Sequence, residues 1–74
     1  MSVVMWEAVA ADGMADDLVR YAKDHADPVA QIYRSRGPRS RVVVIDPTGR
    51  GLADVPGHLL DRPPHAWTFE PVER

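Results

Sequence analysis

Cysteine is absent from this chain of 74 residues. Its absence excludes disulfide bonds and cysteine-ligated zinc or iron–sulfur centres. A domain of this size buries only about 60% of the surface that its unfolded chain exposes. Without covalent cross-links, its hydrophobic core therefore needs dense packing or self-association. We expect one domain that spans residues 1–74.

Long hydrophobic runs and lysine are also scarce. No apolar run approaches the ~20 residues that cross a membrane, and the first residues lack the basic start and apolar stretch of a signal peptide. A cytoplasmic protein without a membrane partner is therefore expected. Arginine supplies eight of the nine basic residues, and the net charge is −2. A charge so close to zero creates no long-range field that attracts nucleic acid or a membrane surface.

Four segments have the composition of β-strands. Residues 3–10 and 42–45 are apolar on both alternating sets of positions, which is typical of strands covered on both faces. Residues 29–35 and 66–72 alternate between apolar and polar positions, as expected at a sheet edge, and Pro71 cannot donate to a ladder. The pattern therefore predicts two central strands and two edge strands.

One long helix is predicted over residues 14–25, where Leu18 and Ala22 belong to a single apolar stripe. Asp12 is the expected capping residue, and Asp27-Pro28 ends the helix. A second, very short helix is expected near residues 55–60, because Gly57 weakens it and Pro63-Pro64 ends it.

This order of elements predicts an α+β fold of the ferredoxin-like βαββαβ type. Its four-stranded antiparallel sheet has the order 4-1-3-2, with one long and one very short helix on one face. The opposite, open face then carries half of the apolar side chains of the central strands. Packing of this face against a second copy removes it from water, so we expect a homodimer.

With these elements, the chain resembles the dimeric α/β-barrel group of small ferredoxin-like proteins, which includes antibiotic-biosynthesis monooxygenase-like proteins. The resemblance covers most of the chain, although this chain is shorter and its second helix is reduced to about one turn. It implies a homodimeric architecture. Members include cofactor-free oxygenases, haem-degrading enzymes and binding proteins. No position here matches a catalytic motif of the group, so whether the protein is an enzyme stays open.

The candidate ligand-binding residues follow from the two possible orientations of the last strand. Alternation places His65, Trp67 and Phe69 on one side of it. The favoured interpretation is that Trp67 and Phe69 pack beneath the helices, because Ala30 and Ile32 need partners of comparable size. In the alternative, these aromatic side chains line the open face. The candidates under the favoured interpretation are Trp6, Tyr33, His65 and Glu70.

These residues favour a small-molecule-binding or accessory protein whose apolar pocket carries a few polar groups and needs no cofactor. An alternative, implied by the resemblance alone, is a cofactor-free oxygenase acting on an aromatic substrate. A structural interaction module without a ligand is the third possibility. His58, Asp61 and His65 are usable metal ligands, but Pro63 and Pro64 prevent them from sharing one helix, so no metal is expected.

Four arginines flank the turn between the second and third strands: Arg34, Arg36, Arg39 and Arg41. Arginines at this density can contact phosphates, or they can protect an edge strand from pairing with other chains. No aromatic residue is interleaved among them to stack on a base. We therefore expect a solvated guard of the sheet edge and no nucleic-acid partner.

Overall fold

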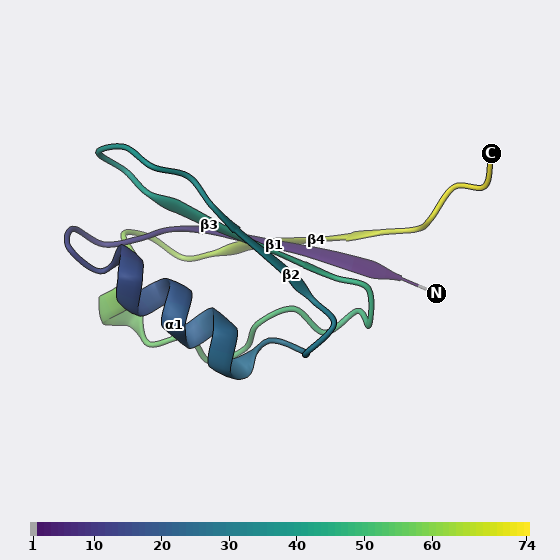
Figure 1. Cartoon of the computed structure of the whole chain (residues 1–74), viewed down its shortest axis with the longest axis horizontal. Coiled ribbons are helices and arrows are strands. Elements are labelled where there is room, and N and C mark those ends of the chain that lie inside the picture. Colours follow the sequence, from purple (N-terminus) through teal and green to yellow (C-terminus); the bar gives the residue numbers. More distant parts are fainter. Residues whose placement is uncertain (1) are drawn as a thin grey trace.

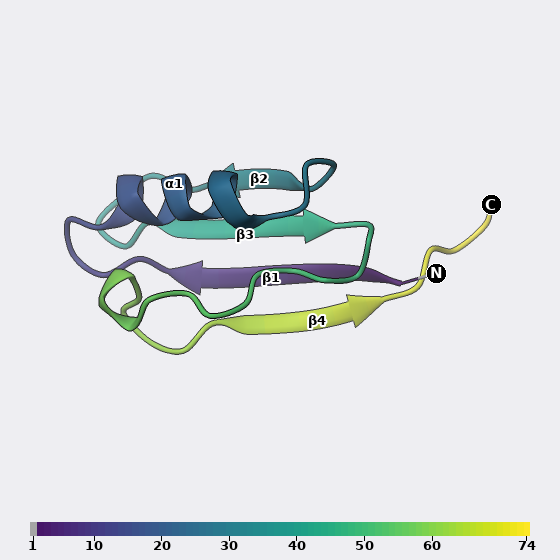
Figure 2. The same cartoon turned by 90° about the horizontal axis from the view of Figure 1, so that it is seen from below.

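The structure is a computed structural model that describes residues 2–74. Its elements are β1 (Val3–Val9), α1 (Ala15–His25), β2 (Gln31–Arg34), β3 (Arg41–Asp46), the 3-10 turn η1 (Gly57–Leu59) and β4 (His65–Phe69). All neighbouring strands are antiparallel, in the order β2-β3-β1-β4 (Figure 2). Counted from the opposite edge, the same order reads 4-1-3-2. The strands that are apolar on both sides, β1 and β3, are the central pair.

The expected βαββαβ fold is wrong in its second half. The chain from residue 2 onward has one α-helix, and the connection between β3 and β4 contains only the three-residue turn η1. Gly57 at its start weakens a regular helix, and Leu60 after it is already extended. The ferredoxin-like pattern is therefore incomplete, and an irregular segment runs alongside β1 and β4 where that pattern places its second helix (Figure 2).

The core lies between the sheet and α1. Leu18 and Ala22 of α1 are fully buried, as are Val42 and Val44 of β3. Trp6 and Leu59 extend this core toward the η1 side. Figure 1 shows α1 and η1 on the same side of the sheet. Burial of these side chains, at about 25 cal/mol for each Å² of apolar surface, is the main stabilising contribution to the fold.

The start of α1 differs from the expected cap. Met14 precedes the helix, and no side chain caps it, while Asp12 lies in the preceding turn. The Met14 N–H instead donates to the Ala11 carbonyl over 2.9 Å. At the other end, Ala26 is extended, and the Val29 N–H donates to the Asp27 carboxylate over 3.0 Å. The helix therefore ends where Asp27-Pro28 predicts.

The turn after β3 is organised by a buried carboxylate. Asp46 accepts hydrogen bonds from the Thr48 N–H (2.7 Å), the Thr48 hydroxyl (2.6 Å) and the Gly51 N–H (2.8 Å), with a longer one from the Arg50 N–H (3.3 Å). Burial alone raises the pKa of Asp46, but these hydrogen bonds outweigh it and lower the pKa below the ordinary 3.8.

The face of the sheet opposite α1 is not covered by any element within residues 2–74 (Figure 1). We call it the open face. Beyond β4, residues 70–74 continue past the end of the sheet (Figures 1 and 2). No helix within the described residues is both long enough and apolar enough to span a membrane.

Candidate functional site

Strand register decides which side chains occupy the open face. Trp6 of β1 packs in the core beside α1, so its neighbours Met5 and Glu7 point the other way. In β4, Trp67 is paired with Met5, and His65 is paired with Glu7. Directly paired residues share one side of an antiparallel sheet, so the side chains of His65, Trp67 and Phe69 lie on the open face.

The favoured orientation of the last strand is therefore wrong. Trp67 and Phe69 are 46% and 50% exposed, and they lie on the open face, not beneath the helix. Conversely, Trp6 is only 2% exposed and belongs to the core, so it cannot line a pocket on the open face. Because side chains alternate along a strand, a shift of one residue in the pairing register moves every side chain of that strand to the other face of the sheet.

Tyr33 and His65, the other two candidates on strands, do lie on the open face. Tyr33 is paired with Val43, which is paired with Glu7, which is paired with His65. They occupy one row across all four strands, with Tyr33 at one edge and His65 at the other. Glu70 lies beyond the end of β4 and is exposed, so the structure does not bring it to this row.

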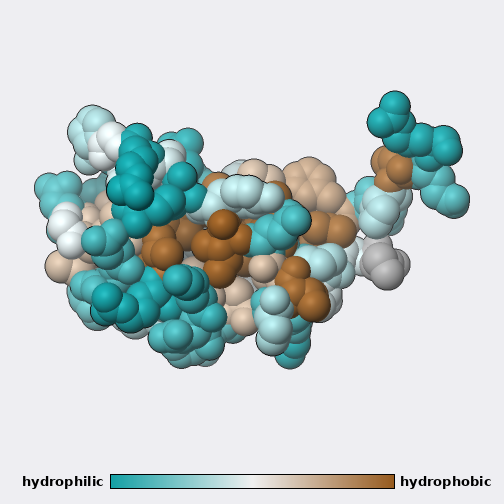
Figure 3. Space-filling view, in the orientation of Figure 1, coloured by the Kyte–Doolittle hydropathy of each residue, from teal (hydrophilic) through white to brown (hydrophobic). Residues whose placement is uncertain are grey.

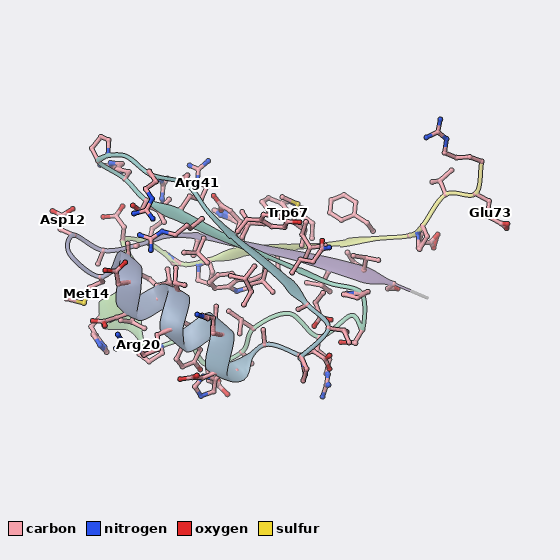
Figure 4. The ribbon with its side chains drawn as sticks, in the orientation of Figure 1. Asp12, Met14, Arg20, Arg41, Trp67 and Glu73 are labelled. Carbon is pink, nitrogen blue, oxygen red and sulfur yellow. The ribbon has the colours of Figure 1, made fainter. Side chains whose placement is uncertain are left out.

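Glu7 is the centre of a charged and aromatic cluster. Its Oε2 lies 2.6 Å from Arg41 Nε, and its Oε1 lies 3.7 Å from His65 Nδ1. The Glu7 side chain is only 15% exposed. The His65 ring stacks on Trp67, with 5.8 Å between ring centroids and 17° between planes. Figure 4 shows Arg41 and Trp67 on the side of the sheet away from α1.

The cluster surrounds a hollow of about 270 Å³ at the start of β4, which we call the Glu7 hollow. It is lined by Glu7, Val9, Arg41, Arg62, Pro63, His65 and Trp67. Two guanidinium groups and one carboxylate give this hollow a net positive charge, whereas the whole chain carries −2. Hollows with apolar walls and a few charged groups are the usual form of small-molecule sites.

The three charged residues of this hollow, Glu7, Arg41 and Arg62, were not predicted as ligand-binding residues from the sequence. One signal was present, because Glu7 is the single charged residue in a strand that is otherwise apolar on both sides. Such a carboxylate needs a partner when it is partly buried. The partner comes from β3, and sequence alone does not give the register that brings Arg41 beside it.

The hairpin arginines are mostly engaged with carboxylates of the chain. Besides the Arg41 pair, Arg34 lies 2.8 Å from Asp16, and Arg39 lies 3.5 Å from Asp61. The hydrogen bond and positive charge of Arg34 lower the pKa of Asp16 below its ordinary value of 3.8. These pairs leave less free positive charge for phosphates than the sequence suggests, and the edge-guard hypothesis stays a prediction.

A larger hollow, about 440 Å³, lies at the end of α1 but is crossed by internal contacts. The Tyr21 hydroxyl lies 3.0 Å from the Ala53 carbonyl and 3.1 Å from that of Asp54, and the His25 ring stacks on Tyr21. Arg50 forms an ion pair with Asp27 across the same region. These groups are occupied in joining α1 to the connection after β3.

A third hollow, which is shallow, lies beside β2, and Val19, Ala30 and Ile32 form its apolar part. In the orientation of Figure 3, hydrophobic side chains reach the surface near the middle of the molecule, between hydrophilic regions. The described residues contain no group of three or more histidine, aspartate or glutamate side chains arranged to hold a metal ion.

No family model, curated protein or solved structure matches this chain. The resemblance to dimeric α/β-barrel proteins therefore stays a prediction. The functional interpretation rests on the side chains of the open face.

Proposed function

We propose that this protein is a homodimer that binds a small molecule between its open sheet faces. The observation that carries the proposal is the position of three large aromatic side chains. Tyr33 (52% exposed), Trp67 and Phe69 all lie on the one face of the sheet that the chain leaves uncovered. Their exposure in a monomer costs free energy that a second copy recovers.

The small size of the core supports self-association. Only α1 and an irregular segment cover the sheet, and all five residues of β4 are exposed. A chain of 74 residues is close to the size at which one core barely stabilises a fold. Burial of the aromatic side chains between two copies adds the apolar contact that the single chain lacks.

The charged groups of the open face are compatible with burial. Glu7 is already paired with Arg41 within the same chain. Contact with a second copy therefore does not leave that carboxylate as an uncompensated buried charge. Because the Glu7 hollow lies on the same face, a partner would cover it and turn an open depression into an enclosed site.

Quenching of tryptophan fluorescence tests the binding part of the proposal. The two tryptophans lie on opposite faces, so a library of small metabolites should quench Trp67 and spare Trp6. We expect the quenching to disappear in Trp67→Phe. Quenching that persists in this variant would place the ligand elsewhere, and a dimer that binds no compound would favour an interaction module without a ligand.

A further inference from the structure

We infer that the Glu7 hollow takes a small aromatic carboxylate, with the acid group on the guanidinium side and the ring on the His65–Trp67 stack. The inference rests on the proposed function, because it names the ligand class of the same site. It goes further in assigning a charge and a shape to the ligand from the residues of the hollow.

The charge of the ligand follows from the two arginines. Arg41 approaches Glu7 through Nε, and a guanidinium group carries five N–H donors. Arg62, which also lines the hollow, has no ion-pair partner within residues 2–74. Since Glu7 neutralises only one of these two cations, the hollow has one positive charge to spare. A carboxylate matches a guanidinium group in charge and in its planar, two-pronged geometry.

The shape of the ligand follows from the remaining walls. The nearly parallel rings of His65 and Trp67 stack on each other, and both side chains are exposed. The ring of an aromatic ligand can extend such a stack in an offset arrangement. Val9 and Pro63 add apolar contact. At about 270 Å³, the hollow is slightly smaller than the roughly 300 Å³ at which small-molecule sites usually begin, which favours one ring over a fused system.

Three probes separate the two features of the ligand: benzoate, benzamide and cyclohexanecarboxylate. Benzamide keeps the ring and removes the charge, while cyclohexanecarboxylate keeps the charge and removes the aromatic face. In a titration followed by NMR, benzoate should shift the indole N–H signal of Trp67 and the ring signals of His65. Each of the other two should bind several-fold more weakly. Benzamide binding as tightly as benzoate would overturn the inference.

The matched variants are Arg62→Gln and Arg36→Gln. Arg36 is likewise without an ion-pair partner within residues 2–74, and it lies outside the Glu7 hollow. Loss of one charge-assisted contact should weaken benzoate binding about tenfold in Arg62→Gln, with no change in Arg36→Gln. Equal affinity in Arg62→Gln and the unaltered protein would contradict the assignment.

The same samples separate this inference from the proposed function. Sedimentation reports whether the protein is a dimer, and the metabolite library reports whether any compound quenches Trp67. A dimer that binds another class of compound and not benzoate would overturn the ligand class and leave the proposed function standing. A monomer that binds nothing would overturn both.

Discussion

At the scale of single residues, the buried carboxylate of Asp46 holds the turn after β3 in place through its hydrogen bonds. It is the one charged or polar residue among residues 2–74 that is buried, and it is fully so. Its oxygens satisfy the Thr48 hydroxyl and three backbone N–H groups of the following turn. Removal of the carboxylate leaves these donors without an acceptor. The free energy lost by burying unsatisfied donors is larger than the net contribution of the hydrogen bonds to stability.

We therefore predict that Asp46→Ala lowers the free energy of unfolding by about 3 kcal/mol, and Asp46→Asn by about half as much. Urea denaturation followed by circular dichroism measures both. Asp24→Asn, at an exposed position of α1, is the control and should leave stability unchanged. An Asp46→Ala variant as stable as this control would show that the hydrogen bonds are not needed.

The lowered pKa of Asp46 also predicts how stability depends on pH. Its pKa in the folded protein lies below 3.8, while an unfolded chain gives about 3.9. The contribution of the ionised group is therefore present above pH 4 and is lost as the pH falls through the folded-state pKa. The stability difference between the unaltered protein and Asp46→Asn should narrow from pH 5 toward pH 2. Parallel profiles would contradict this interpretation.

The two tryptophans show where residue-level prediction from sequence stops. Alternation correctly groups His65, Trp67 and Phe69 on one side of β4, and Trp6 with Ala8 on one side of β1. It does not say which side receives the helix, because β1 is apolar on both. The choice depends on the pairing of β4 with β1, which is a long-range feature. For that reason Trp6 and Trp67 exchanged their expected places.

At the scale of elements, the connection after β3 depends on a glycine in a left-handed conformation. Gly51 has φ of +66°, and a Cβ there would lie 3.0 Å from the Val4 side chain. Gly51→Ala should lower the free energy of unfolding by about 1–2 kcal/mol, because both the backbone and the contact oppose it. Thermal unfolding measures the change.

Gly57→Ala is the matched control in the same connection. Gly57 does not have a positive φ, and a Cβ there meets nothing within 4 Å. Its replacement should leave stability unchanged or raise it by less than about 1 kcal/mol, since alanine restricts the unfolded chain. Equal destabilisation by the two substitutions would show that local strain at Gly51 is not the cause.

The arginine hairpin between β2 and β3 gives a prediction about nucleic acid. Because three of its four arginines form ion pairs within the chain, we expect no oligonucleotide binding at physiological salt. Arg36→Ala combined with Arg39→Ala should chiefly increase aggregation, which light scattering measures. Binding that weakens with salt at a log–log slope of roughly −3, and is lost in the double variant, would instead indicate phosphate contacts.

Local sequence signals predicted the regular elements well. The expected helix over residues 14–25 is observed as Ala15–His25, and β1 and β3 lie in the middle of the sheet. The same signals gave wrong predictions for the N-cap of α1 and for the connection between β3 and β4. Asp12 is displaced from the cap by a backbone hydrogen bond at Ala11. At η1, Gly57 weakens the expected helix, and only a single 3-10 turn forms.

At the scale of the whole molecule, the fold has two layers, a sheet and a helical layer in which the three-residue turn η1 stands in place of a second helix. Helix α1 and the connection through η1 lie on one side of the sheet (Figure 1). The strand register places the aromatic side chains of β2 and β4 on the other side. Apolar strand patterns predicted the existence of this open face. They could not predict the Glu7 hollow, because it is assembled from β1, β3, β4 and the residues Arg62 and Pro63.

The oligomeric state tests the central claim, that the open face is covered by a second copy. Phe69→Lys places a charge on that face outside the Glu7 hollow, whereas Val29→Lys places one at a more exposed apolar residue in the turn before β2. In sedimentation velocity at tens of micromolar, we predict a dimer for the unaltered protein and for Val29→Lys, and a folded monomer for Phe69→Lys. An unaltered protein that sediments as a monomer, or a Phe69→Lys variant that remains a dimer, would contradict the account.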